Sequence, residues 1–251
     1  MCGRFVASRP VEDIARLLAV DELDVPADLA APRWNVAPQA TVLAVTSSRE
    51  TPGLRRLSAF RWGLVPWWAK DPSIGARAFN AKSETVEDKA MFRGAVARQR
   101  CIIPADAFYE WAPAAGDSKR RKQPWCFRSA DSGLLLLAGL FERWRPPEAE
   151  EATAAGAAAP LRTCTILTTE ANELVGRVHN RMPVLIGERQ VEEWLSREPL
   201  GPGELRLLTR PAPVGALEAF RVSTRVNDAR EEGPSLQEPV ADEEGGEAQL
   251  F

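Results

Sequence analysis

The residue with the most distinctive chemistry is Cys2, which directly follows the initiator methionine. Removal of Met1 is favoured when the second residue is small, and it would leave a cysteine with a free α-amine beside its thiol. The pKa values of these groups are about 8 and about 8.5, so each is less basic than a lysine amine. Such an amine can form a Schiff base with an aldehyde, and the thiol can then close a five-membered thiazolidine ring. By position alone, an ordinary small buried residue is the commoner role for Cys2.

Two titratable residues could move protons for such a reaction. Glu110 lies in an otherwise apolar run, Phe108-Tyr109-Glu110-Trp111, and burial in a crowded cleft would raise its pKa and suit it to proton transfer. An arginine-paired carboxylate at a strand edge is equally compatible with this pattern. His179 is the chain's one histidine, and it falls at or just past a predicted helix C-terminus, which stabilises a protonated imidazole. A lone histidine is more often structural than catalytic.

Polar and aromatic residues elsewhere allow both structural and functional interpretations. Asn80 precedes a predicted helix, so a turn or capping role is the simpler interpretation, and the same holds for Asn35. Trp62, Trp67 and Trp68 flank a proline turn. They could form plain core, or a surface on which unpaired bases stack while nearby arginines hold phosphates.

The segments that must position these residues are short strands with irregularly interspersed helices. Apolar spacing predicts helices over Pro10–Ala19 and Glu188–Ser196, a helical stretch from Ser83 to about Arg98, and a helix capped by Thr169 that buries Leu174, Val175 and Val178. Alternating or apolar runs predict strands over Thr41–Thr46, Arg56–Trp62, Cys101–Ile103, Phe108–Trp111, Trp125–Arg128, Leu134–Leu140 and Thr163–Leu167.

The order of these elements lacks the regular strand–helix alternation of a parallel sheet. The predicted fold is therefore α+β, a single domain whose antiparallel sheets curve into a barrel-like core with surrounding helices. Ala112–Gln123 reads as a polar loop whose basic run is either solvated or in contact with phosphate. The Ala- and Glu-rich segment Pro146–Pro160 reads as a variable surface hairpin loop.

Length, charge and cysteine content narrow the class of protein. A chain of 251 residues with 45% hydrophobic and 27% charged residues is typical of a soluble globular protein with a substantial core. The four cysteines are scattered without a CxxC pair, so neither a zinc site nor a disulfide framework is expected. With no secretion signal and no membrane-length apolar run, we expect a cytoplasmic protein, and we predict no metal, cofactor or membrane partner.

The net charge of -3 conceals an acidic C-terminal end. Residues 231–251 contain seven acidic residues and no basic one, so the remainder is modestly basic. A basic body permits a polyanionic partner without requiring one. We expect residues 241–251 to be a disordered acidic tail after a domain over 2–240.

Taken together and in order, several short motifs resemble the SRAP (SOS response-associated peptidase) family of abasic site processing proteins. Each motif is weak alone, and the ordered set, which covers roughly residues 2–240, is specific. The motifs are Met1-Cys2-Gly3-Arg4-Phe5, Asn35-Val36-Ala37-Pro38, Arg61-Trp62-Gly63-Leu64-Val65-Pro66, Asn80-Ala81-Lys82-Ser83-Glu84, Phe108-Tyr109-Glu110-Trp111, His179-Asn180-Arg181-Met182-Pro183, Val226-Asn227 and Gly233-Pro234.

The resemblance implies a nucleoid-associated monomer of the DNA damage (SOS) response that recognises abasic sites in single-stranded DNA. Cys2 would form a thiazolidine with the ring-opened sugar, which is a covalent protein–DNA crosslink that protects the site. Asn80 would hold the sugar. Glu110 would transfer protons during Schiff-base formation and in removal of Met1. His179 would protonate the sugar and assist reversal. The implied DNA contacts are Arg4, Trp67, Trp68, Arg77, Lys82 and Arg181.

Some features depart from the family pattern. Lys82 stands where many relatives have arginine, and lysine contacts phosphate as a point charge without a bidentate fork. The chain ends Ala248-Gln249-Leu250-Phe251, which resembles peptides that bind the bacterial sliding clamp. Two other functions stay open, namely a peptidase with an N-terminal nucleophile and a non-catalytic module that binds single-stranded DNA.

Overall fold

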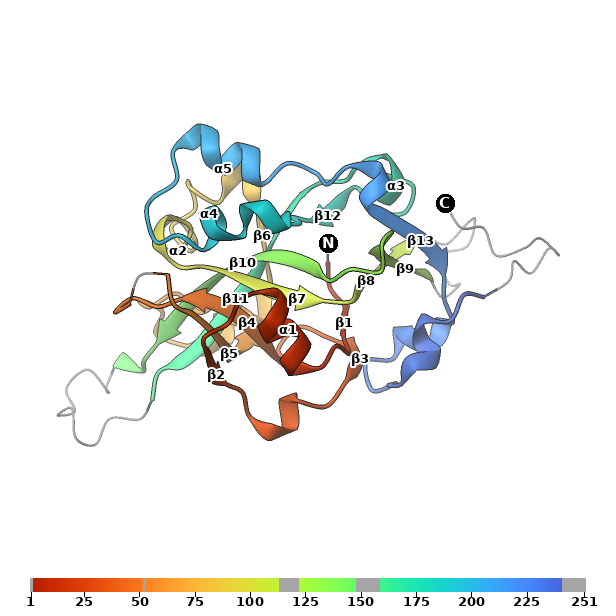
Figure 1. Cartoon of the computed structure of the whole chain (residues 1–251), viewed down its shortest axis with the longest axis horizontal. Coiled ribbons are helices and arrows are strands. Elements are labelled where there is room, and N and C mark those ends of the chain that lie inside the picture. Colours follow the sequence, from red (N-terminus) through yellow and green to blue (C-terminus); the bar gives the residue numbers. More distant parts are fainter. Residues whose placement is uncertain (1, 52, 113–121, 148–158, 241–251) are drawn as a thin grey trace.

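The core is a closed barrel of five strands, which the computed structural model describes together with the rest of residues 2–51, 53–112, 122–147 and 159–240. The strands are β4 (Thr41–Ser47), β5 (Arg55–Trp62), β7 (Arg100–Ala105), β10 (Leu135–Trp144) and β11 (Leu161–Glu170). Antiparallel pairing runs β5–β4–β7–β10–β11. A parallel pairing of β11 with β5, through Thr163↔Arg61 and Cys164↔Trp62, closes the ring (Figure 1).

Side chains alternate between the two faces of the barrel strands, as the two-residue period of a strand requires. In β10, Leu135, Leu137 and Phe141 join one buried cluster, whereas Leu136, Ala138 and Leu140 join another. The first cluster also contains Cys2. The second includes residues from the helices that cover the outside of the barrel, so the barrel is filled on one face and covered on the other.

A second, five-stranded antiparallel sheet packs against the barrel. Its strand order is β13 (Leu217–Arg221), β9 (Gln123–Ser129), β8 (Ala107–Ala112), β1 (Phe5–Ala7) and β3 (Arg33–Val36). Phe108 and Phe127 stack within it, with centroids 5.0 Å apart. Phe5 meets Trp62 of the barrel edge-on at 5.2 Å, so β1 joins the sheet to the barrel.

Short elements surround these sheets. The helices are α1 (Val11–Leu17), α2 (Arg93–Arg98), α3 (Glu173–Gly176), α4 (Val191–Leu195) and α5 (Pro202–Leu208). The remaining strands are β2 (Glu22–Asp24), β6 (Asn80–Lys82) and β12 (Arg181–Pro183), and short 3-10 turns connect many elements. Among the helices within the described ranges, none is long and apolar enough to cross a membrane.

These observations confirm the α+β class, the barrel-like core and most predicted strands, and they correct two helix predictions. The helical stretch expected from Ser83 to Arg98 is a 3-10 turn over Ser83–Thr85 followed by α2, which begins only at Arg93. No residue between Val86 and Phe92 is fully buried, so the apolar spacing that would hold a continuous helix against the core is missing.

The second correction concerns Thr169, which lies in β11 opposite Met182 instead of capping a helix. Asn172 takes that role, because its side chain accepts a hydrogen bond of 2.9 Å from the Val175 backbone N–H. Leu174, Val175 and Val178 are buried as predicted. Trp144↔Leu161 pairing brackets the expected hairpin loop, whose residues 148–158 lie outside the described part of the chain, as does the 241–251 tail with its clamp-like ending.

Close packing around Gly139 leads to a testable prediction. Gly139 lies in β10, between β7 and β11. A Cβ atom there would lie 2.8 Å from Cys101 Sγ and 3.0 Å from both Ile103 Cδ1 and the Thr165 carbonyl oxygen. Gly139→Ala should therefore lower the free energy of unfolding by about 1–3 kcal/mol, the usual cost of overpacking a core. Urea unfolding measures this change.

Gly94→Ala is the matched control for this substitution. An added Cβ at Gly94 meets nothing within 4 Å, and the residue lies in α2, where alanine is favoured over glycine by about 0.5–1 kcal/mol. The control should be as stable as the natural protein or more so. If Gly139→Ala unfolds at the same urea concentration as Gly94→Ala, the described packing is wrong.

Candidate active site

The start of the chain is fixed in the interior by strand pairing. β1 pairs with β8 through Phe5↔Phe108, and the Arg4 carbonyl accepts a hydrogen bond of 2.9 Å from the Tyr109 backbone N–H. Cys2 is consequently fully buried, close to the strand that carries Glu110. Burial, and then the nearby negative carboxylate of Glu110, raise the pKa of the Cys2 thiol well above its usual range.

Asn80 lies directly against Cys2. Its Nδ2 donates a hydrogen bond of 2.7 Å to the Cys2 carbonyl oxygen, and its Oδ1 is buried with no hydrogen-bond partner among the described residues. Asn80 opens β6, which pairs in parallel with β11 through Ile166, so it is a strand residue and not a turn or a helix cap. The preceding Phe79 carbonyl accepts a hydrogen bond of 2.8 Å from Trp62 Nε1, which holds this segment against the barrel.

Glu110 lies in β8 and is only 2% exposed. Burial raises the pKa of its carboxyl from 4.5 to about 7, in the direction that the sequence predicted. Both protonation states are therefore populated near neutral pH, and this is the condition under which one group can donate and accept protons efficiently.

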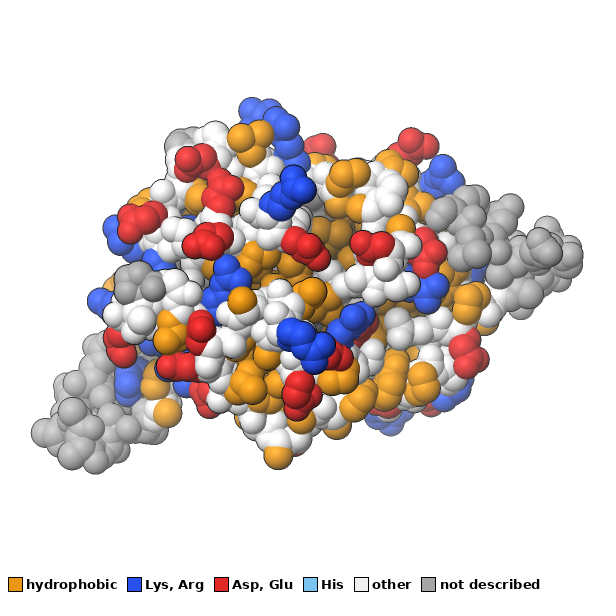
Figure 2. All heavy atoms as spheres, viewed as in Figure 1, with side chains coloured by type: hydrophobic (Ala, Val, Ile, Leu, Met, Phe, Trp, Pro, Cys, Tyr) orange, Lys and Arg blue, Asp and Glu red, His pale blue; other side chains and the backbone are white. Residues whose placement is uncertain are grey.

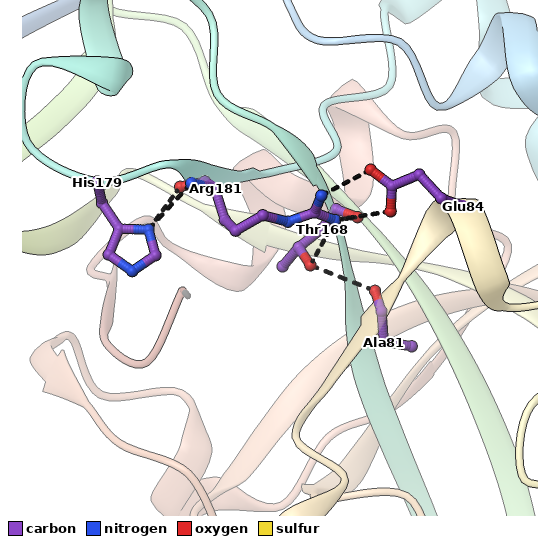
Figure 3. A network of polar contacts seen from close by, with 5 residues as sticks. All are labelled: Ala81, Glu84, Thr168, His179 and Arg181. Carbon is purple, nitrogen blue, oxygen red and sulfur yellow. Dashed lines mark hydrogen bonds and ion pairs between the residues drawn. The ribbon is translucent and has the colours of Figure 1, made fainter.

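His179 follows α3 and is half-buried. Its Nδ1 lies 3.0 Å from the Arg181 backbone N–H and 3.3 Å from the Arg181 carbonyl oxygen (Figure 3). The shorter contact, in which Nδ1 accepts, favours the neutral tautomer with its proton on Nε2. Burial lowers the pKa of His179 from 6.5, whereas the sequence suggested stabilisation of the protonated form. That expectation is wrong because α3 has only four residues, and the cost of burying a charge outweighs the small dipole of so short a helix.

Glu110 and His179 line the same pocket, which has a volume of about 990 Å³. Arg4 contributes to it as well, and its guanidinium is held by Asn35 Oδ1 at 2.7 Å and by the Val226 carbonyl at 3.0 Å. The other lining residues are Trp111, Lys122, Thr224, Arg225, Asn227, Asp228, Ala229, Arg230 and Glu231. The pocket thus brings together an imidazole, three carboxylates and several cations.

The 224–231 segment is the part of the pocket that the sequence motifs missed, apart from Asn227. The buried Asn35 holds it in place, because Asn35 Nδ2 donates to the carbonyl oxygens of Asp228 at 2.9 Å and Glu231 at 3.0 Å. Asn35 lies in strand β3 and not in a turn or a helix cap. Its hydrogen bonds anchor a loop that is distant in the sequence. The Asn35 motif was visible in the sequence, whereas only Val226-Asn227 of its partner segment was.

The predicted DNA contacts divide by accessibility. Trp67 and Trp68 are 66% and 46% exposed, whereas Trp62 is a core residue. Arg77 and Lys82 are exposed on either side of Asn80 in the sequence. Arg181 is instead held by Glu84, through two hydrogen bonds of 2.6 and 2.9 Å. Acidic and basic side chains are interspersed on the face shown in Figure 2, which displays no continuous basic surface.

Comparison with known proteins identifies the family of this chain. A sequence model of the SOS response associated peptidase (SRAP) family matches residues 1–229. The chain belongs to the SRAP family. The abasic site processing protein YoqW of Bacillus subtilis is 37% identical, with 95% of this chain and 99% of that protein covered. The chicken abasic site processing protein HMCES is 32% identical, with 83% of this chain and 66% of that protein covered.

Solved structures support the SRAP fold. A protein from Bacteroides thetaiotaomicron superposes with a TM-score of 0.79 over 96% of this chain and all of that one, at 22% identity. A protein from Bordetella bronchiseptica gives a TM-score of 0.67 at 26% identity, with 88% of this chain and all of that one covered. The barrel with its attached sheet is therefore the fold of this family.

The buried carboxyl of Glu110 makes a prediction about stability and pH. Because its folded-state pKa of about 7 exceeds its ordinary 4.5, the folded protein keeps a proton that the unfolded chain releases. This contribution to stability is complete below about pH 4.5 and is lost as pH rises through about 7. Between about pH 4.5 and pH 7, the free energy of unfolding of Glu110→Gln should therefore rise by on the order of 3 kcal/mol relative to that of the natural protein.

Urea unfolding of chains that begin with Met1, at a series of pH values, measures this difference. Glu173→Gln is the control, since Glu173 is exposed and only forms a long ion pair of 3.4 Å with Arg177. Its stability relative to the natural protein should change little with pH. A Glu110→Gln difference that is equally flat would show that Glu110 is not buried as described.

Proposed function

We propose that this protein processes abasic sites in single-stranded DNA by forming a covalent thiazolidine through Cys2 after Met1 has been removed. The observation that carries the proposal is the convergence of two long-range contacts on Cys2. Asn80 donates a hydrogen bond of 2.7 Å to its carbonyl, and the Glu110 carboxylate lies close enough to raise the pKa of its thiol. The names of the relatives, abasic site processing proteins, favour the same substrate.

The reaction balances without an oxidant or a reductant. The α-amine of Cys2 attacks the aldehyde of the ring-opened deoxyribose, and loss of one water gives a Schiff base. The Cys2 thiol then adds to the imine carbon, and its proton goes to the imine nitrogen, which closes the ring. The product no longer has the free aldehyde whose neighbouring proton is lost in β-elimination, so the DNA strand is protected from cleavage.

Two groups share the proton transfers. Glu110, with a pKa of about 7, accepts a proton from the attacking amine and returns it to the departing water. His179 presents Nε2–H because its Nδ1 is occupied by the Arg181 N–H, so it can donate to the sugar ring oxygen as the ring opens. The buried Oδ1 of Asn80 is an acceptor for a sugar hydroxyl. Glu110 also takes part in the removal of Met1.

Binding of the strand follows from the exposed residues. Trp67 and Trp68 offer rings on which unpaired bases stack, and Arg77 and Lys82 offer cations for phosphates. Arg4 reaches the pocket itself, whereas the charge of Arg181 is offset by its ion pair with Glu84. Because one chain supplies all of these groups, we propose a monomer that acts on nucleoid DNA in the DNA damage response.

The state of the thiol distinguishes this chemistry from general proteolysis. A cysteine peptidase needs a thiolate, whose formation is favoured by a lowered pKa. Burial instead raises the pKa of Cys2, which favours attack by the amine first and addition of the thiol second. Proteolysis limited to Met1 agrees with this arrangement, and cleavage of other proteins does not.

A crosslinking assay tests the proposed function. Protein whose mass shows the loss of Met1 should form a heat-stable adduct with single-stranded DNA that contains one abasic site, and none with the intact strand. Cys2→Ser should abolish the heat-stable adduct, since a serine cannot close a thiazolidine. Glu110→Gln should slow adduct formation by about 10²–10⁴-fold, the usual contribution of general acid–base catalysis.

Cys126→Ser is the control, because Cys126 is an equally buried thiol in a different core cluster. This variant should crosslink like the natural protein. A heat-stable adduct with Cys2→Ser would contradict the mechanism. Equal, salt-sensitive binding of abasic and intact strands without any adduct would instead indicate a non-catalytic binding module.

A further inference from the structure

Glu84 forms the most regular ion pair near the site, although no motif gives it a chemical role. Arg181 donates from both terminal nitrogens to the two carboxylate oxygens of Glu84, at 2.6 and 2.9 Å (Figure 3). The same guanidinium donates to the Thr168 carbonyl at 2.6 Å. The Arg181 side chain is only 12% exposed, so this is a partly desolvated, bidentate pair of the kind that fixes geometry.

The pair spans three strands. β11 lies between β6 and β12, with Ile166 opposite Asn80 on one side and Glu170 opposite Arg181 on the other. Glu84 follows directly after β6, in the turn Ser83–Thr85. The ion pair therefore bridges β11, and it ties the strand that begins with Asn80 to the strand that begins just after His179.

The Thr168 hydroxyl adds a second contact to this bridge. Thr168 Oγ1 donates to the Ala81 carbonyl at 3.4 Å and is itself 3.3 Å from an Arg181 nitrogen. The chain of contacts runs from Glu84 through Arg181 and Thr168 to Ala81, the residue after Asn80 (Figure 3). The network thus extends from His179 to the backbone of Ala81, the residue next to the candidate catalytic residue Asn80.

Arg181 connects this network to the imidazole through its backbone. Its N–H donates to His179 Nδ1 at 3.0 Å and thereby selects the Nε2–H tautomer, while its side chain extends away to Glu84. Two anchors hold the residue that presents this N–H: the backbone of Arg181 pairs with Glu170 of β11, and its guanidinium is fixed by Glu84 and the Thr168 carbonyl.

We infer that Glu84 is a positioning residue, which fixes the orientation and tautomer of His179 through Arg181. This inference rests on the proposed function for its catalytic consequence. Its structural content, that the Glu84 carboxylate determines the Arg181 N–H to His179 Nδ1 bond, stands independently. Glu84 and His179 are almost one hundred positions apart in the sequence, and Arg181 contacts both of them.

The chain's single histidine makes the inference measurable by NMR without assignment ambiguity. In Glu84→Ala we expect the Arg181 amide to exchange with solvent at least tenfold faster, and the ¹⁵N shift of His179 Nδ1 to move toward that of a free imidazole. Glu84→Gln keeps one oxygen acceptor, so its exchange rate and ¹⁵N shift should lie between those of the natural protein and those of Glu84→Ala. Crosslinking to abasic DNA should slow in the same order.

Glu173→Gln is the matched control, because it removes an exposed carboxylate that pairs with Arg177 in the helix just before His179. It should leave both NMR signals and the crosslinking rate unchanged. If Glu84→Ala folds poorly, Glu84→Gln provides the comparison, with smaller shifts in the same direction.

The outcomes separate this inference from the proposed function. An unchanged Arg181 amide and an unchanged Nδ1 shift in both Glu84 variants would overturn it. So would altered NMR signals with full crosslinking activity, since the positioning would then have no catalytic effect. If the natural protein forms no adduct, the proposed function fails, and the NMR comparison alone still decides whether Glu84 positions His179.

Discussion

The site depends on one constraint, which is that the first residues of the chain form an interior strand. β1 lies between β8 and β3, and Phe5 packs against Trp62 of the barrel. Chain termini usually fray unless strand pairing or docking fixes them. Here both operate, and Cys2 is held without solvent exposure beside the strand of Glu110. In the proposed function, the amine and the thiol of Cys2 would thereby have a fixed direction of approach.

Burial also sets the proton chemistry. It moves the pKa of Glu110 up to about 7 and moves the pKa of His179 down from 6.5, which reverses the ordinary order of a carboxylic acid and an imidazole. Glu110 can then both donate and accept a proton near neutral pH. The cost is stability, since a buried carboxyl is tolerated only while much of it is protonated.

The sequence predicted the parts of this protein that are governed by local pattern. Alternating apolar residues placed β4, β5 and β8 within a residue or two of their ends. For the glutamate between aromatic residues, the sequence left burial and pairing with an arginine equally open, and the structure shows that Glu110 is buried. Prediction from the sequence failed where long-range contacts determine the local structure. Asn172 caps α3 instead of Thr169 because β11 continues as far as Glu170, and the pocket loop 224–231 depends on Asn35 from the other end of the chain. Glu84 and Arg181 each stand in one of the short motifs, but neither motif shows that the two side chains pair across the fold.

The central claim is that the reactive unit is the amine and the thiol of Cys2 acting together. Mass spectrometry of the digested adduct with abasic DNA tests it most directly. We expect a modified peptide that begins at Cys2, with a mass equal to that of the peptide plus the sugar fragment minus one water. Alkylating reagents should no longer modify its thiol. A modified peptide that still carries Met1, a free Cys2 thiol in the adduct, or attachment through a lysine would contradict it.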